Sequence, residues 1–347
     1  MSATLPALDT DVPPPEAGAA QLQAATPWWL AGGHAQTIWP ALFSRRTRLG
    51  QPAWRRERWT TPDQDFVDAD WLDSEAPDDA PLMVMFHGLE GSSASHYVQA
   101  MADTCRRRGW RMVLPHFRGC SGELNLAPRA YHSGDHAEIG WMLAQARARH
   151  AGPMVAVGVS LGGNALMRWA QEAGGQAGEL ACAVASVCSP LDLHRCGEAI
   201  AQGFNFHVYT RMFLRTMKPK AQAKWLQHPG LFDLDAVMKA RTIKAFDHHF
   251  TAPLHGFASA DDYYTRASAK PGMARIRIPA LALNARNDPF VPADCLPRPH
   301  EVGNVTLWQP ETGGHVGFAA GRWRTQVWQV SDLLCDWMAP HLPHPIA

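Results

Sequence analysis

The stretch 154-MVAVGVSLGGNALMRW-169 decides the fold. Its first half is an apolar run typical of a buried strand, and its second half favours a helix. Ser160 lies between the two, flanked by Gly158 and Gly162 in the pattern G-x-S-x-G. This pattern also occurs by chance in ordinary loops, but the strand and the helix favour a sharp, strained turn that exposes a serine hydroxyl. We therefore predict Ser160 as a nucleophile.

A serine hydroxyl needs a histidine to accept its proton and a carboxylate to orient that histidine. Residues 277–283 predict a buried strand that runs into the turn-forming cluster 284–289, which holds one carboxylate, Asp288. Residues 304–308 predict another strand, followed by a glycine pair and His315. We therefore predict Asp288 as the acid and His315 as the base.

Other interpretations of these residues stay open. Asn-Asp-Pro is ordinary turn chemistry, so Asp288 by itself is typical of a turn cap. The chain has 17 histidines, and any single one is more often a surface or core residue. Asp294, Asp261 and Asp262 are rival acids, but none directly follows a strand-like run. Asp294 is the second candidate.

A third predicted strand, residues 81–86, ends in the glycine-containing loop 87-HGLEGSS-93. Backbone N–H groups of such a loop can converge on a developing alkoxide. We predict the amides of Leu89 and Leu161 as the oxyanion donors and a structural role for His87. The alternative is a plain connection between a strand and a helix.

Five segments carry a family resemblance: 32-GGHAQTIWP-40, 87-HGLEG-91, 117-FRGCSG-122, 158-GVSLGGN-164 and 287-NDPF-290. In them the chain resembles the YheT-like branch of the α/β-hydrolases, over about residues 25–340. The resemblance implies an α/β-hydrolase fold, carboxylic-ester hydrolysis and a triad of Ser160, Asp288 and His315. It also implies eukaryotic relatives that act on phospholipid acyl chains.

The composition of the 347-residue chain is typical of a globular enzyme, with 46% apolar residues. Lys plus Arg equals Asp plus Glu at 32 each, which argues against a nucleic-acid partner. The longest apolar stretch, 154–167, is too short and glycine-rich for stable membrane insertion. Seven scattered cysteines argue against a disulfide framework and favour a cytoplasmic location.

Alternation of strands and helices predicts a mostly parallel central sheet flanked by helices. We expect a disordered tail at 1–24, where Pro, Ala and Asp are abundant and no signal peptide is evident. Two parts of the core follow, 25–191 and 273–347, separated by a helical lid insertion at 192–272. Within the core we expect a hairpin at 54–60 and 65–72, strands at 82–86, 111–115, 153–159 and 181–187, and helices at 95–108, near 139–146 and at 323–338.

The expected lid is rich in large apolar side chains, and Tyr209, Leu214 and Met217 are among those expected on its underside. Phe204, Phe206, Met212 and Phe213 are predicted to line an acyl pocket on its underside. The alternative is that they only pack the insertion onto the sheet.

Charged residues of the lid and the adjoining loops are expected to face solvent. Lys218, Lys220 and Lys224 predict a solvated helix face. Arg118 and Arg211 are candidates for contact with a phosphate head group, although a charged loop residue is usually only solvated.

No metal or cofactor is expected. His132 and His136 are four apart and His248 and His249 are adjacent, but a zinc site needs three or four ligands around one point. His34, in the first family segment, predicts a structural hydrogen bond near the rim of the site. No glycine-rich phosphate motif or dinucleotide fingerprint is present.

Together these patterns predict a serine ester hydrolase that acts on short- to medium-chain acyl esters or lipid esters through an acyl-enzyme. An acyltransferase with the same triad is one alternative, and added acceptor alcohol separates the two by their products. A catalytically silent binding protein is the other, and it would not react with a fluorophosphonate.

Overall fold

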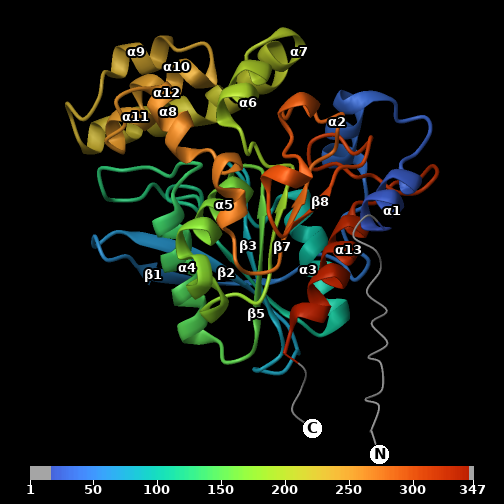
Figure 1. The fold of residues 1–347 in the computed structure, drawn as a ribbon. Coiled ribbons are helices and arrows are strands. Elements are labelled where there is room, and N and C mark those ends of the chain that lie inside the picture. The colour runs from blue at the N-terminus through green and yellow to red at the C-terminus, as the bar shows by residue number, and fades with distance from the viewer. Residues whose placement is uncertain (1–16, 344–347) are drawn as a thin grey trace, which may run out of the picture.

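The computed structural model describes residues 17–343, and an eight-stranded sheet forms its centre, in the order β1-β2-β4-β3-β5-β6-β7-β8 (Figure 1). All neighbouring strands from β4 to β8 are parallel, whereas β1 and β2 are antiparallel to their neighbours. The mostly parallel sheet confirms the predicted architecture. The strands are β1 Trp54–Thr60, β2 Phe66–Leu72, β3 Leu82–Phe86, β4 Arg111–Pro115, β5 Met154–Val159, β6 Val184–Val187, β7 Ala280–Leu283 and β8 Val305–Trp308.

Helices cover both faces of the sheet because its central strands are apolar on both sides. In β5 every residue is buried. Met154 and Ala156 face one hydrophobic cluster, with α4 (His136–Arg149) and α5 (Leu161–Ala173). Val155 and Val157 face the other, with α3 (His96–Arg108) and α13 (Trp328–Met338). Such continuous apolar strands are typical of a parallel sheet buried on both faces.

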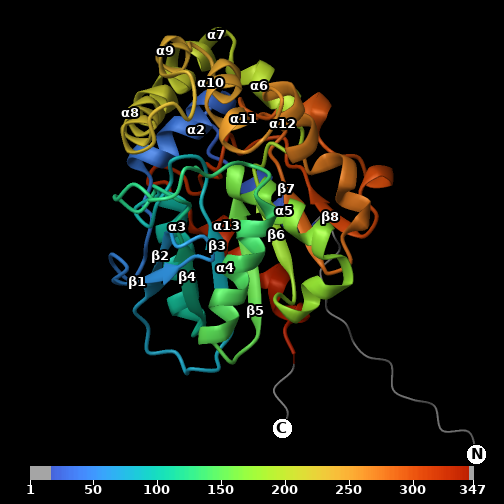
Figure 2. The ribbon, with the colours of Figure 1, turned by 90° about the vertical axis from the view of Figure 1, so that its left-hand side faces the viewer.

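Between β6 and β7 the chain forms a helical cap, which we define as residues 192–272. The cap lies beyond the carboxyl ends of the parallel strands, as the yellow and orange helices of Figures 1 and 2 show. It has a hydrophobic cluster of its own, centred on Leu214, Phe246 and Phe250. Its helices are α6 Leu193–Ile200, α7 Gly203–Asn205, the π-helix η2 Phe206–Thr210, α8 Arg211–Gln227, α9 Leu234–Lys239, α10 Ile243–His249, α11 Thr251–Leu254 and α12 Ala260–Ala267.

The prediction of a disordered tail at 1–24 extends too far along the chain. Helix α1 (Ala17–Ala25) already forms there and buries Leu22 at 3% exposure against the cluster that holds α13. The abundance of Pro and Asp is confined to the residues before α1, and an average over 1–24 hides the helix formers that follow. The rest of the expected tail lies outside the described residues.

Two other elements begin at least three residues later than predicted. The strand expected from 181 begins at 184, and the helix expected from 323 begins at 328. The backbone before α13 instead pairs with Arg45 and Ala320 through Gln326. Within residues 17–343, no helix has both the length and the apolar character needed to cross a bilayer.

Candidate active site

Ser160 occupies a strained turn at the carboxyl end of β5. Its φ of 52° and ψ of −119° lie outside the regions that L-residues prefer. The turn requires small neighbours, because a Cβ on Gly158 would lie 2.5 Å from the Cα of Gly163 and one on Gly162 would lie 2.5 Å from the carbonyl oxygen of His87. This close approach explains the glycines of the G-x-S-x-G pattern. Ser160 itself is partly exposed.

The structure brings the three predicted triad residues together. Asp288 follows β7, and His315 follows β8. His315 donates through Nδ1 to Asp288 Oδ2 at 2.8 Å, which leaves Nε2 free to accept from Ser160 Oγ at 3.1 Å. The Asp288 carboxylate is fully buried, and its other oxygen accepts from the Phe290 backbone N–H at 2.8 Å. The geometry suits transfer of the serine proton to His315.

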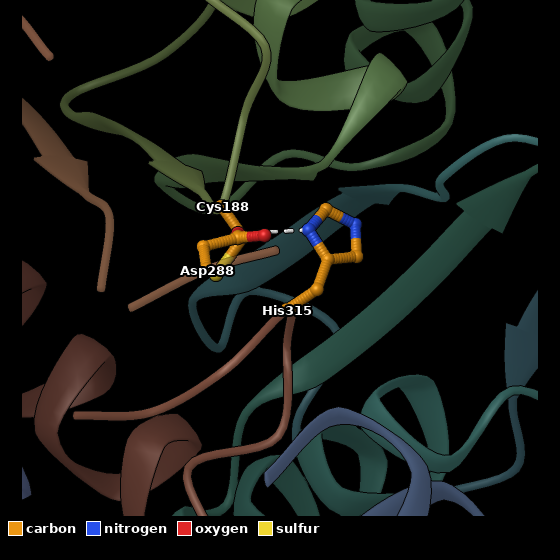
Figure 3. A group of neighbouring side chains, drawn as sticks. All are labelled: Cys188, Asp288 and His315. Atoms are coloured by element: carbon orange, nitrogen blue, oxygen red, sulfur yellow. Dashed lines mark hydrogen bonds and ion pairs between the residues drawn. The ribbon is translucent and has the colours of Figure 1, made fainter. Parts of the chain in front are cut away.

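Cys188, at the end of β6, lies beside Asp288 and His315, as Figure 3 shows. Its thiol accepts from the Val316 N–H at 3.2 Å and points to the Gly314 carbonyl at 3.7 Å, so it contacts the backbone on both sides of His315. Burial and the nearby Asp288 charge raise the pKa of this thiol well above its ordinary value. These three side chains could offer ligand atoms within 4.8 Å of one another, but a metal ligand must be a thiolate, which this environment disfavours.

Helix α2 (Gly32–Phe43) holds the loops of the acid and the base in place. Gln36, 3% exposed, accepts through Oε1 from the Gly313 N–H at 2.8 Å and from Asn287 Nδ2 at 2.9 Å. Its Nε2 donates to the Leu30 carbonyl at 2.7 Å. The neighbouring Thr37 hydroxyl accepts from the His315 N–H at 2.8 Å. In the first family segment the sequence singles out His34, but Gln36 is the residue that bonds to both loops.

We expect Gln36→Leu to lower kcat about 100-fold with little change in KM, because loops that carry the acid and the base would shift relative to Ser160. Steady-state kinetics on a soluble ester measures this. Gln171→Leu is the control, since Gln171 is also a buried glutamine, bonded to Arg168 and Ala269. An equal loss of kcat in both variants would show that Gln36 has only a general structural role.

The loop after β3 presents the predicted oxyanion donor. The N–H groups on either side of Leu89 are engaged, that of Gly88 with the Tyr97 hydroxyl at 2.9 Å and that of Glu90 with the Tyr131 hydroxyl at 3.1 Å. The Leu89 N–H has no acceptor among residues 17–343. A Cβ on Gly88 would lie 3.2 Å from the Ser160 Cβ, so this loop adjoins the serine.

His87 fixes the direction of that free N–H. Its Nε2 accepts from the Phe117 N–H at 3.1 Å, so its Nδ1 carries the proton and donates to the Gly88 carbonyl at 2.7 Å. Burial keeps the ring neutral by lowering the pKa of His87 to about 3. A trans peptide points its C=O and N–H in opposite directions, so the bond to the Gly88 carbonyl also orients the Leu89 N–H. The second predicted donor, Leu161, begins α5, where a helical N–H has no intrahelical acceptor.

A cavity of about 1180 Å³, which includes its opening to solvent, runs from the triad under the cap. Of the four predicted pocket residues, only Phe213 lines it. Phe204 is 48% exposed and Met212 is 51% exposed, and Phe206 packs against His207 instead. The apolar lining from the cap is Leu193, Cys196, Ile200, Phe213, Met217, Ile243, Phe246 and Phe250, of which the sequence pattern predicts only Phe213 and Met217.

The expectation of a solvated face is wrong for two of the three lysines. Lys220 donates to Glu90 Oε1 at 2.9 Å, and Glu90 directly follows Leu89, the predicted oxyanion donor. Lys224 is 1% exposed and donates to the carbonyls of Asn125 and Ala127. Burial lowers the pKa of Lys224 to about 8. These residues recur every fourth position on α8, so one helix face is held to the core.

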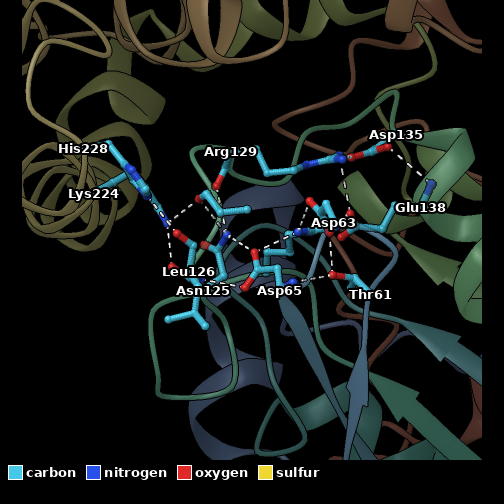
Figure 4. Close-up of polar contacts among 12 residues, drawn as sticks. Thr61, Asp63, Asp65, Asn125, Leu126, Arg129, Asp135, Glu138, Lys224 and His228 are labelled. Carbon is cyan, nitrogen blue, oxygen red and sulfur yellow. Dashed lines mark hydrogen bonds and ion pairs between the residues drawn. The ribbon is translucent and has the colours of Figure 1, made fainter.

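Arg118 does not fit the expected contact with a phosphate head group. Its side chain is 4% exposed and bonded to Asp63, Asp65 and Glu138, so it has no free donor edge for a phosphate head group. Figure 4 shows this polar network, which continues through Asn125 and Leu126 to Lys224 and His228 of the cap.

The remaining candidates lie apart from the triad. Asp294 pairs with Arg195, and Asp261 pairs with Lys244 on the surface. Asp262 accepts from the Ala258 N–H. His34 meets the Tyr209 hydroxyl at 3.3 Å, which agrees with its expected structural hydrogen bond.

Comparison with known proteins agrees with the observed fold. A family model described as the α/β-hydrolase fold matches residues 81–321. YheT of Escherichia coli (strain K12), to which an esterase activity is ascribed, is 39% identical over 318 residues, covering 89% of this chain and 91% of YheT. Human phospholipase ABHD3 is 29% identical over 310 residues, covering 86% and 74% of the two chains.

A monoacylglycerol lipase of Saccharomyces cerevisiae is 28% identical over 284 residues, covering 77% of this chain and 60% of its own. Among solved structures, Est1E from Butyrivibrio proteoclasticus superimposes with a TM-score of 0.50 at 13% identity, covering 84% of this chain and 99% of Est1E. The structural match is a similarity of fold.

Proposed function

As a member of the α/β-hydrolase family, this chain is a carboxylic-ester hydrolase, and we propose that it works through an acyl-enzyme on Ser160. The hydrogen-bonded line from Asp288 through His315 to Ser160 carries the proposal. A neutral imidazole bonded at Nδ1 to a buried carboxylate is oriented to accept a proton at Nε2.

In the proposed reaction, Ser160 Oγ attacks the ester carbonyl carbon as His315 Nε2 takes its proton. The Leu89 and Leu161 amides stabilise the oxyanion, each worth about 100- to 1000-fold in turnover. His315 then protonates the leaving alcohol as the carbon–oxygen bond breaks. Water, deprotonated by His315, attacks the acyl-enzyme and releases the acid and Ser160. The residues require no cofactor for these steps.

Trapping of the intermediate tests this proposal. We expect a p-nitrophenyl ester, quenched in acid within the first turnover, to add one acyl mass to the peptide containing Ser160. A fluorophosphonate should label the same residue. Absence of both adducts in folded protein would contradict the proposal and favour a binding role. Transfer of the acyl group to an added alcohol in preference to water would instead identify a transferase.

The cavity supports an acyl chain as the buried part of the substrate. Its cap-derived lining is mostly apolar, and ligand pockets lined in this way bury most of the surface of the ligand that they hold. Charged residues of the lining are already paired, Glu90 with Lys220 and Arg118 with carboxylates of its own network. We therefore propose short- to medium-chain esters or lipid esters as substrates.

Met217→Trp is expected to shorten the longest p-nitrophenyl ester that is hydrolysed efficiently, because Met217 lines the cavity and indole would fill part of it. A series from acetate to palmitate measures the shift in kcat/KM. Gln222→Trp places the same side chain on an exposed position of α8 and should leave the profile unchanged. Equal profiles for all three proteins would rule out the cavity as the acyl site.

A further inference from the structure

The helical segment 203–227, formed by α7, η2 and α8, has an exposed stripe opposite its cavity-lining face. Exposed positions recur every three or four residues along it, as expected for one side of a helix. Large apolar side chains occupy several of them, with Phe204 at 48%, Val208 at 37%, Met212 at 51% and Leu226 at 68% exposure. Among the described residues outside this segment, such exposure of large apolar groups is rare on cap helices, where only Met238 reaches 39%.

The charges on this stripe are all of one sign. Arg211 and Arg215 are exposed between the apolar residues, and the segment 203–227 contains no Asp or Glu, although the whole chain is electrically balanced. Neither arginine forms an ion pair with another described residue, whereas exposed Arg195 pairs with both Glu198 and Asp294. The cations of the stripe are therefore unneutralised.

The same segment forms one wall of the cavity. Phe213 and Met217 line the cavity from its inner face, while Met212 and Arg215 face outward. Helix α2 adjoins the stripe, since the rings of His34 and Phe204 lie 4.4 Å apart, and α2 also lacks Asp and Glu. One helix thus separates the acyl cavity from an apolar, basic surface.

We propose that this stripe docks on the surface of an anionic lipid bilayer. A helix that exposes both apolar and basic residues, and no acidic ones, suits the boundary between head groups and acyl chains. Basic side chains are attracted by anionic lipids, and each contributes roughly fivefold to affinity near the surface. Docking is peripheral and places the outer side of the cavity wall against the lipid, which, if the proposed ester hydrolysis holds, makes membrane-resident esters its substrates.

Co-sedimentation of the full chain with vesicles tests this proposal. We expect binding to equimolar phosphatidylglycerol and phosphatidylcholine, and much weaker binding to phosphatidylcholine alone. Arg211→Glu with Arg215→Glu should weaken binding to anionic vesicles at least about 25-fold. Val208→Ser with Met212→Ser should weaken it in low and high salt alike, since apolar burial is not screened.

The control is Arg55→Glu with Arg277→Glu, which removes the same charge at exposed positions near the starts of β1 and β7, at the opposite end of the sheet. This protein should bind like the wild type. The proposal would be overturned if vesicle binding were weakened equally in the control, or if the wild-type protein did not bind anionic vesicles.

Hydrolysis of soluble p-nitrophenyl butyrate by the variant Arg211→Glu with Arg215→Glu separates the docking proposal from the proposed ester hydrolysis. Undiminished hydrolysis with lost vesicle binding supports docking as a separate property. Vesicle binding without any ester hydrolysis in the wild type would contradict the proposed function and leave the docking surface standing.

Discussion

Ser160→Ala is expected to lower kcat for p-nitrophenyl esters by about 10⁴-fold or more, since loss of the nucleophile leaves only oxyanion stabilisation and binding. KM should change little, because the apolar lining from the cap, which we assign to the acyl chain, is unchanged. The fold should persist, since the substitution removes one atom from a partly exposed site.

Ser189→Ala is the matched control. Ser189 lies just beyond β6, which is the strand next to β5. Its hydroxyl is buried without a hydrogen-bond partner among residues 17–343. We expect kcat within about twofold of the wild type, because no interaction is lost. Comparable rates for Ser160→Ala and the wild type would place the nucleophile elsewhere.

The largest effect on stability is expected for Arg118→Met. Removal of the Arg118 guanidinium leaves the buried carboxylates of Asp65 and Glu138 without their main cation, which costs about 3–5 kcal/mol of unfolding free energy. Burial already raises the pKa of Glu138 to about 7 with Arg118 present. The free energy of unfolding, measured by urea titration, shows the loss directly.

Arg195→Met provides the comparison. Arg195 also bonds two carboxylates, at 2.8 Å and 2.7 Å, but these partners are exposed, so less than about 1 kcal/mol should be lost. Similar losses in both variants would show that burial is not the cause.

The Arg118→Met deficit should also depend on pH. Burial opposes ionisation of Asp63, but hydrogen bonds from Arg118 and Thr61 lower its pKa below 3.8 in the folded protein. That carboxylate contributes stability above its unfolded pKa and loses it as the pH falls further. The variant lacks this contribution, so the stabilities of the two proteins should converge toward acidic pH. A constant difference across the acid range would contradict this assignment.

Much of the core could be predicted from the sequence because its signals are local. Strand β5 is a continuous apolar run, and Gly109 ends α3 with a φ of 65°, as expected of a helix-terminating glycine. Asp288 and His315 could be chosen because each follows a strand, and parallel strands end at one edge of the sheet. The signal for each of the two residues is local, and the topology of the sheet brings the two residues together.

The rest depends on contacts between distant segments. Gln36 joins two loops more than 250 residues away in the chain, and no local pattern distinguishes it from other glutamines. In the cap, the predicted pocket residues were chosen by size and polarity, but a helix with apolar residues on both faces does not reveal which face turns inward. Phe213 and Met212 are adjacent, and only the first lines the cavity.

The cap leaves the sheet after β6 and returns at β7, and these two strands are direct neighbours. Its entry and exit are therefore close together, so insertions and deletions within it need not disturb strand pairing. Ser160 precedes the cap, while Asp288 and His315 follow it. Changes to one continuous stretch of the gene can therefore alter the cavity that we assign to the acyl chain while Ser160, Asp288 and His315 stay unchanged, an arrangement that allows the range of substrates to change while the reaction stays the same.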